Sequence, residues 1–209
     1  ALANLTKFKA DGIESITLSD AQFAGAAGSK SALDNALSNN ALTVNGADTG
    51  VTIDAAGYTK GLKLNGGTGD DTITGGAGAD DMAGGLGNDV FVIGNADSGV
   101  TTATADIIRG FVTGTDKLDL AVAGSADLGT AGYLLAYDNI FGGVASVEEA
   151  VAVANGSFVG SSTTSYQFIY DSVGGTAGYL CADLNGDNLT DLVVQLAGVT
   201  SAIAFGDII

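Results

Sequence analysis

A nine-residue repeat constrains this chain more than any other feature of its sequence. Three uninterrupted nonapeptides fill residues 66–92, and each has the form Gly-Gly-x-Gly-x-Asp-x-U-x, in which U is an apolar residue. The apolar beat falls on Leu64, Ile73, Met82 and Phe91. A helix gives no reason for a glycine-punctuated period of nine, whereas stacked short strands joined by tight turns do. The sequence therefore predicts a parallel β-roll, a β-solenoid with a narrow apolar core.

The polar positions of the repeat favour a hard cation. Glycine reaches backbone conformations closed to other residues, so each turn can aim carbonyl oxygens inward. Asp71, Asp80 and Asp89 recur at the sixth place and add carboxylates. Ca²⁺ takes roughly six to eight such oxygens in flexible geometry, whereas Mg²⁺ demands a strict octahedron. We therefore expect calcium as the cofactor. The alternative is a metal-free solenoid, in which nothing offsets the repulsion between stacked carboxylates.

Composition excludes several other classes of function. The chain has 209 residues, no His and one Cys, Cys181, so it holds no His-based triad, no HExxH zinc site and no internal disulfide. Its 24 acidic and 7 basic residues give a net charge of −17, which argues against nucleic acid and anionic membranes as partners. No apolar run is long enough for a transmembrane helix, so no membrane insertion is expected.

The segment before the repeats has a weaker pattern. Residues 13–18 alternate apolar and polar side chains, as a half-buried strand does. Residues 31–37 are consistent with one or two helical turns that Ser31 would cap. Residues 1–56 are therefore expected to form a degenerate solenoid or a lead-in segment. Because the chain starts without Met, we expect it to be a piece of a longer protein or to have a processed N-terminus.

The segment after the repeats predicts antiparallel strands and one short helix. Ser146 with Glu149 three residues later has the spacing of a capping box, so a helix is expected to begin there and to end at 155–156. Alternating patterns predict strands at 165–171, 178–183, 191–196 and 202–205. The fold class is therefore all-β: a parallel β-roll over 57–95, then an antiparallel β domain over 96–209 with one short helix.

These motifs resemble the C-terminal region of RTX proteins, which type I secretion systems export. Residues 105–111 and 114–120 are similar to the segment that follows the roll in serralysin-type proteases, so the resemblance covers roughly residues 57–209. The rung at 57–65 keeps the nine-residue period but departs from the family, because it has Leu62 where Asp belongs. The resemblance implies a roll with two repeats per turn and secretion from a bacterial cell.

The resemblance also implies a set of calcium ligands. Each ion lies between two loops that are two repeats apart and takes backbone carbonyls and one Asp from each loop. Carried onto this chain, the complete site is expected to use Gly67, Gly69, Asp71, Gly84, Leu86 and Asp89. The middle loop offers Gly76, Gly78 and Asp80 and needs a partner outside the repeats, for which either Asp97 or Asp106 is expected.

A second candidate metal loop lies between two expected strands, at residues 183–191. Oxygen ligands stand at places one, three, five, seven and nine: Asp183, Asn185, Asp187, Leu189 through its carbonyl, and Asp191. The spacing is similar to the DxNxDGxxD calcium loops of FG-GAP propeller repeats. It is no EF-hand, because place twelve is Val194 where a bidentate Glu belongs. An Asx-rich hairpin turn without an ion remains the alternative.

These features favour a calcium-folded module without enzymatic activity of its own. Residues 204–209, an acidic residue followed by apolar ones, resemble the C-terminal export signal of type I secreted proteins; an ordinary terminal strand is the alternative. The parent is expected to be a surface-layer protein or adhesin, secreted or held at the cell surface, with the exporter, calcium, and a second copy or a surface glycan as partners. The alternative is the non-catalytic tail of a secreted hydrolase such as a metalloprotease or lipase.

Overall fold

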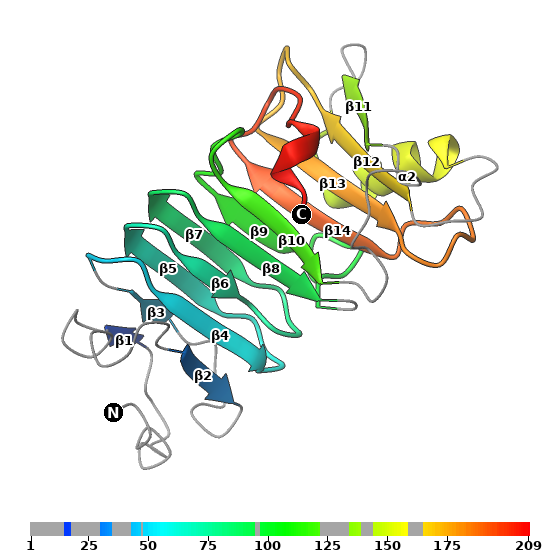
Figure 1. The fold of residues 1–209 in the computed structure, drawn as a ribbon. Coiled ribbons are helices and arrows are strands. Elements are labelled where there is room, and N and C mark those ends of the chain that lie inside the picture. Colours follow the sequence, from blue (N-terminus) through cyan, green and yellow to red (C-terminus); the bar gives the residue numbers. More distant parts are fainter. Residues whose placement is uncertain are drawn as a thin grey trace.

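The strands of this chain alternate between two sheets (Figure 1). The computed structural model describes residues 15–17, 30–34, 43–46, 48–94, 97–121, 134–138, 144–158 and 165–209. Within these residues, one sheet has the strand order β1-β3-β5-β7-β9-β14-β13-β12-β11 and the other β10-β8-β6-β4-β2. Odd-numbered strands up to β9 lie in the first sheet and even-numbered strands up to β10 in the second. This alternation is the winding of a β-roll.

The roll consists of short strands that pair in parallel with the strand one turn away. The first sheet receives β1 (Ser15–Thr17), β3 (Thr43–Asn45), β5 (Lys63–Thr68), β7 (Asp81–Leu86) and β9 (Asp106–Arg109). The second receives β2 (Lys30–Asp34), β4 (Thr52–Gly57), β6 (Thr72–Thr74), β8 (Val90–Gly94) and β10 (Lys117–Ala121). Leu64 pairs with Met82 and Ile73 with Phe91, so one turn takes two nonapeptides, and the predicted roll is confirmed.

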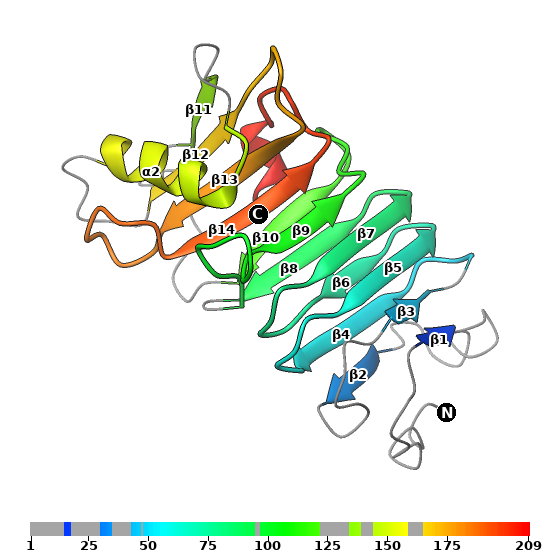
Figure 2. The same ribbon diagram turned by 180° about the vertical axis from the view of Figure 1, so that it is seen from behind.

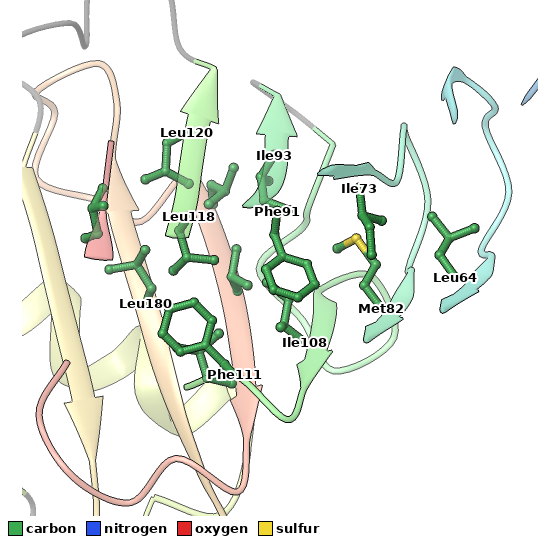
Figure 3. Packing of buried hydrophobic residues seen from close by; sticks show 14 of the residues in the cluster. Leu64, Ile73, Met82, Phe91, Ile93, Ile108, Phe111, Leu118, Leu120 and Leu180 are labelled. Carbon is green, nitrogen blue, oxygen red and sulfur yellow. The ribbon is translucent and has the colours of Figure 1, made fainter. Parts of the chain in front are cut away.

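The apolar beat of the repeats forms the core between the two sheets (Figure 3). Leu64, Ile73, Met82 and Phe91 are each fully buried there. Burial of one such side chain stabilises a fold by about 1.5–3 kcal/mol. The core is therefore one residue wide per strand, which makes each turn of the roll depend on its neighbours.

The roll continues beyond the three repeats in both directions. Upstream, Val44 pairs with Leu64 and Ile53 with Ile73; downstream, Ile108 pairs with Met82 and Leu118 with Phe91. Both sheets thus run without a break past residues 56 and 95, the boundaries set from sequence. The helical turns predicted at 31–37 are wrong, because β2 occupies residues 30–34. Pairing with β4 outweighs the local helical preference.

The C-terminal strands extend the first sheet of the roll. They are β14 (Leu192–Ala197), β13 (Ala177–Asp183), β12 (Ser165–Tyr170) and β11 (Leu134–Asp138). β14 lies parallel to β9, β13 is antiparallel to both β14 and β12, and β11 is parallel to β12. The three strands predicted over 165–196 are confirmed within about one residue at each end.

One helix, α2 (Val147–Ser157), lies across β12, β13 and β14 (Figure 2). Its N-cap is Ser146, whose hydroxyl accepts a hydrogen bond from the Glu149 N–H at 3.2 Å, as the capping-box spacing predicts. The Glu149 carboxylate in turn accepts from the Ala145 N–H at 2.7 Å. The buried face of α2 packs with Tyr179, Cys181 and Val193 in a second apolar cluster. No helix in the described ranges is long and apolar enough to span a membrane.

The last residues close the outer edge of β10. Residues 202–205 do not form the predicted strand; a single 3₁₀ turn, η2, covers Phe205–Asp207 instead. Ile208 then bridges to Leu118, and the Ile209 N–H donates to the Leu118 carbonyl at 2.9 Å. The buried Asp207 carboxylate accepts from the Gly114 N–H at 2.9 Å and from the Lys117 ammonium at 3.4 Å. The terminus thereby covers an otherwise unpaired strand edge.

Candidate metal centre

Buried carboxylates form a ladder along each side of the roll, at the turns that lead into its strands. We call Asp71, Asp89 and Asp116 the first ladder, and Asp80 and Asp106 the second ladder. All five side chains are buried, with at most 3% of their surface exposed. Isolated carboxylates are rarely buried so completely, because the charged form loses its hydration. The arrangement therefore calls for a counter-charge.

Hydrogen bonds link the members of each ladder. In the first ladder, the Asp71 N–H donates to Oδ1 of Asp89 at 3.0 Å, and the Asp89 N–H donates to Oδ1 of Asp116 at 3.1 Å. In the second ladder, the Asp80 N–H donates to Oδ1 of Asp106 at 2.9 Å. Each carboxylate thus uses one oxygen to bind the backbone of the preceding turn, which fixes where its second oxygen lies.

The second oxygens are the unexplained atoms of the structure. Oδ2 of Asp71, Asp80 and Asp106 is buried and has no hydrogen-bond partner. Buried polar atoms are almost always paired, because an unpaired one costs about 1–3 kcal/mol, and more when it is charged. Hard carboxylate and carbonyl oxygens are the ligands that calcium takes. These unpartnered oxygens therefore fit a bound calcium ion.

The first glycine of each nonapeptide makes room for these oxygens. A Cβ on Gly66 would lie 2.1 Å from Oδ2 of Asp71, and one on Gly75 would lie 2.2 Å from Oδ2 of Asp80. The second glycine has a different role: Gly67 and Gly85 have φ angles of 126° and 113°, which other residues rarely adopt. The glycines of the motif therefore shape the loops around the carboxylates.

Burial shifts the acidity of the ladder strongly. Loss of hydration raises the pKa of Asp71 to about 7 and the pKa of both Asp80 and Asp106 to about 8. Burial also raises the pKa of Asp89, and the nearby charges of Asp116 and Asp70 add to this effect. Without a cation, the ladders at neutral pH must either take up protons or keep unpaired buried charges.

Gly66→Ala is expected to raise the calcium concentration needed for folding at least tenfold. Its Cβ would also lie 2.5 Å from the Gly84 carbonyl oxygen, which belongs to the backbone and cannot rotate away. The matched control is Gly156→Ala in α2, where nothing lies within 4 Å of the new Cβ and stability should rise by about 0.5–1 kcal/mol. Calcium titrations followed by circular dichroism compare the two; equal midpoints would contradict the packing account.

The structure brings the six residues of the predicted complete site onto two stacked loops. The Gly69 N–H donates to the Leu86 carbonyl at 2.7 Å, and Gly67 pairs with Gly85. Asp71 and Asp89 are joined as described above. The Leu86 side chain is 72% exposed, which leaves only its backbone facing the loop. Coordination by Gly67, Gly69, Asp71, Gly84, Leu86 and Asp89 stays a prediction.

Both residues considered for the middle loop lie next to it. Gly78 donates its N–H to the Asp97 carbonyl at 3.4 Å, and Asp80 is joined to Asp106. On the other side, the Leu62 N–H donates to Oδ1 of Asp80 at 2.8 Å. Since Leu62 brings no carboxylate, the second ladder does not continue upstream at this rung. Ligation by Gly76, Gly78, Asp80, Asp97 and Asp106 also stays a prediction.

Sequence reasoning missed Asp116, although a signal for it exists. Asp89-Val90-Phe91 reads Asp, any residue, then a core residue, and Asp116-Lys117-Leu118 repeats that order. Both oxygens of Asp116 are partnered, since Oδ2 accepts from the Val112 N–H at 2.8 Å. The first ladder therefore ends on a carboxylate that the protein itself satisfies.

The loop at residues 183–191 satisfies its own carboxylates. Oδ1 of Asp183 accepts from the Gly186 N–H at 2.7 Å, and Oδ2 accepts from the Asn188 N–H at 2.9 Å. Both oxygens of Asp191 are also partnered, by Leu184 and Asn185. Asn188 has a φ of 70°, the left-handed conformation that Asn tolerates. Metal binding through Asp183, Asn185, Asp187, Leu189 and Asp191 stays a prediction beside the Asx-turn alternative.

Among the described residues, no three acidic or Cys side chains converge in a geometry that holds a metal ion. The ladders offer pairs of carboxylates instead, each close to backbone carbonyls. A cation here is therefore bound as much by the backbone as by side chains. This explains why loop shape, set by glycine, matters as much as the number of Asp residues.

Comparison with known proteins identifies the cation. Residues 63–91 match the family model of the RTX calcium-binding nonapeptide repeat (4 copies). No curated protein matches the chain. Among solved structures, the chain is similar to the AlgE6R3 subunit of the mannuronan C5-epimerase from Azotobacter vinelandii, with 23% sequence identity, 80% of this chain and 76% of that chain covered, and a TM-score of 0.49. RTX nonapeptide repeats bind calcium, so the predicted cofactor is confirmed.

Proposed function

We propose that this chain is a calcium-folded, non-catalytic module of a bacterial protein secreted through a type I system. The observation that carries the proposal is the set of buried, unpartnered Oδ2 atoms on Asp71, Asp80 and Asp106. Calcium supplies the positive charge that these oxygens lack. The lack of catalysis is supported by the absence of His from the chain and by burial of the Cys181 thiol, which raises its pKa and keeps it unreactive.

Two costs keep the calcium-free chain from folding in this proposal. The ladders would bring carboxylates together in a desolvated place, and the glycine-rich loops lose much conformational entropy when they become ordered. Calcium binding offsets both costs, so binding free energy becomes folding free energy. Extracellular calcium modules have dissociation constants of roughly 10⁻⁴–10⁻³ M. The module therefore stays unfolded in the cell and folds outside.

The position of the C-terminus supports this order of events. Asp207 and Ile208, within the stretch that resembles an export signal, are buried against β10 in the folded chain. An exporter that reads residues 204–209 needs them accessible, so it acts on the chain before folding. Calcium outside the cell then closes the terminus onto the roll.

Chelation tests the calcium-dependent fold. We expect EDTA at pH 7.5 to abolish most of the β signal in far-UV circular dichroism, and excess calcium to restore it, because the ladders of residues 57–120 depend on the ion. Excess magnesium is the control and is expected to restore little, since it demands octahedral geometry and keeps its waters. An unchanged spectrum and melting temperature in EDTA would refute the proposal.

For the parent protein we propose a surface-layer protein or adhesin, in which this module anchors the chain and assists export. Support comes from a sequence rich in Ala, Thr, Gly and Asp and from the solenoid-like pattern upstream of the repeats. A second copy of the chain or a cell-surface glycan is the proposed partner. The second candidate is the tail of a secreted metalloprotease or lipase, which the roll suits equally well. Calcium-dependent assembly separates them: electron microscopy and light scattering should show sheets for the first and monomers for the second.

A further inference from the structure

We propose that the carboxylates of Asp80 and Asp106, together with the backbone carbonyl of Asp97, hold a calcium ion outside the matched repeats, where the roll meets the C-terminal strands. The proposal rests on the proposed function in one respect, that the ladders take calcium. It adds a site whose second half comes from residues 97–106, beyond the residues 63–91 that match the repeat model.

The two ladders repeat the same contacts. In the first ladder, Gly69 donates to the carbonyl of Leu86 at 2.7 Å, and Asp71 donates to the carboxylate of Asp89 at 3.0 Å. In the second ladder, nine residues later, Gly78 donates to the carbonyl of Asp97 at 3.4 Å, and Asp80 donates to the carboxylate of Asp106 at 2.9 Å. Asp97 and Asp106 therefore provide the carbonyl and the carboxylate that Leu86 and Asp89 provide within the repeats.

The periodicity alone would have assigned this place to another residue. Nine residues after Asp89 the chain has Ser98, which is no carboxylate. The chain between β8 and β9 is longer than a repeat loop, and Asp106 reaches the ladder from the start of β9, where the neighbouring residue Ile107 pairs with Asp81 of β7. The structure, and not the spacing, selects Asp106.

Unpartnered oxygens point to a ligand at this place. Asp80 and Asp106 are both at most 1% exposed, and Oδ2 of each has no hydrogen-bond partner. The carboxylate of Asp97 adds negative charge that acts on both of them. Its own Oδ2 accepts from the Gly94 N–H at 2.8 Å, which shapes the loop around the site. Two buried oxygens without a donor, in a region of concentrated negative charge, need a cation.

The same segment fastens the roll to the C-terminal strands. The Ser98 hydroxyl accepts from the Asp106 N–H at 2.7 Å and donates to the Val193 carbonyl of the segment that carries β14. Asp106 also pairs with Val194 across the β9–β14 contact. An ion bound by Asp106 therefore orders the strand on which β14 is built, and couples calcium binding in the roll to folding of the C-terminal part.

Counting bound ions tests this site. The full chain is saturated with calcium at pH 7.5, freed of excess ion by equilibrium dialysis, and analysed for calcium per chain. Asp106→Asn is expected to bind one ion fewer than the wild type. The matched control is Asp119→Asn, which removes the same charge from β10 outside the ladders and is expected to keep the wild-type number. An unchanged number in folded Asp106→Asn would overturn the site while leaving the calcium-folded module intact.

A second variant decides the matter if Asp106→Asn does not fold. Asp97→Asn keeps the backbone carbonyl and removes only a nearby charge from a half-buried side chain. It is expected to keep the full number of ions and to raise the calcium midpoint of folding several-fold, because like charges near the ion favour its binding. A midpoint equal to that of Asp119→Asn would overturn the proposal. A wild type that binds no calcium would instead refute the proposed function.

Discussion

At pH 8 without calcium the chain is expected to lack its β-roll, and acidification to about pH 5 is expected to restore much of the β signal. The cause is the raised pKa of three buried carboxyl groups, about 7 for Asp71 and about 8 for Asp80 and Asp106. In the unfolded chain these groups titrate near their ordinary value of about 3.9. Protons at acidic pH thus neutralise the same carboxylates that calcium neutralises at pH 8.

The direction of this pH dependence follows from proton linkage. Between about pH 4 and pH 8 the folded chain binds more protons than the unfolded chain, so the free energy of unfolding falls as pH rises. A pKa shift of one unit corresponds to about 1.4 kcal/mol, so the three groups together amount to about 10 kcal/mol or more. That equals the whole stability of an ordinary domain, about 5–15 kcal/mol.

The pH series has a control in saturating calcium. There the slope reverses, because calcium binds the deprotonated carboxylates and its affinity rises until they are ionised. Far-UV circular dichroism from pH 5 to pH 8, with EDTA or with calcium, gives both curves. A β signal in EDTA that stays constant over this range would contradict the assignment of unpaired charge to the ladders.

Asp71→Asn is expected to stabilise the calcium-free chain and to weaken its response to calcium. Asn keeps an oxygen that can accept from the Val51 N–H, which donates to Oδ1 of Asp71 at 2.7 Å. Its amide would replace Oδ2 beside the Gly84 carbonyl, since both oxygens come within 2.5 Å of the same point above Gly66. The buried charge disappears, which is expected to contribute about 4 kcal/mol at pH 8 without calcium.

The neighbouring Asp70 provides the control for this variant. Asp70 is exposed, and hydrogen bonds from the backbone and side chain of Asn88 lower its pKa. Asp70→Asn makes the same change of charge one residue away and should leave the calcium-free state unfolded. Urea unfolding with and without calcium measures both variants. If Asp71→Asn lost stability in EDTA as well as in calcium, burial of charge would not be the dominant cost.

The repeats made much of this architecture predictable. Leu64, Ile73, Met82 and Phe91 recur at a fixed interval, so the strands, the core and the two-repeat turn follow from counting. The helix at Ser146 followed from its cap, because capping depends on residues close in sequence. Local signals of this kind are strong enough to survive folding.

Long-range pairing was not readable in the same way. β2 has a helical pattern at residues 31–37 but becomes a strand beside β4. β14 joins β9 although Val194 and Asp106 are far apart in the chain, and this contact makes one sheet of two expected domains. Asp116 and the position of Asp106 escaped prediction because insertions break the nine-residue interval. In each case the deciding contact comes from another turn of the roll.

Linkage between calcium and stability tests the central claim most directly. The free energy of unfolding is measured by urea titration at pH 7.5 and fixed ionic strength, at free calcium concentrations from about 10 µM to about 10 mM, with magnesium as the control. We predict that it rises steeply with the logarithm of calcium concentration, with a slope that corresponds to more than one ion taken up on folding, and that magnesium has little effect. A free energy of unfolding that does not change with calcium would contradict the claim that calcium completes the carboxylate ladders.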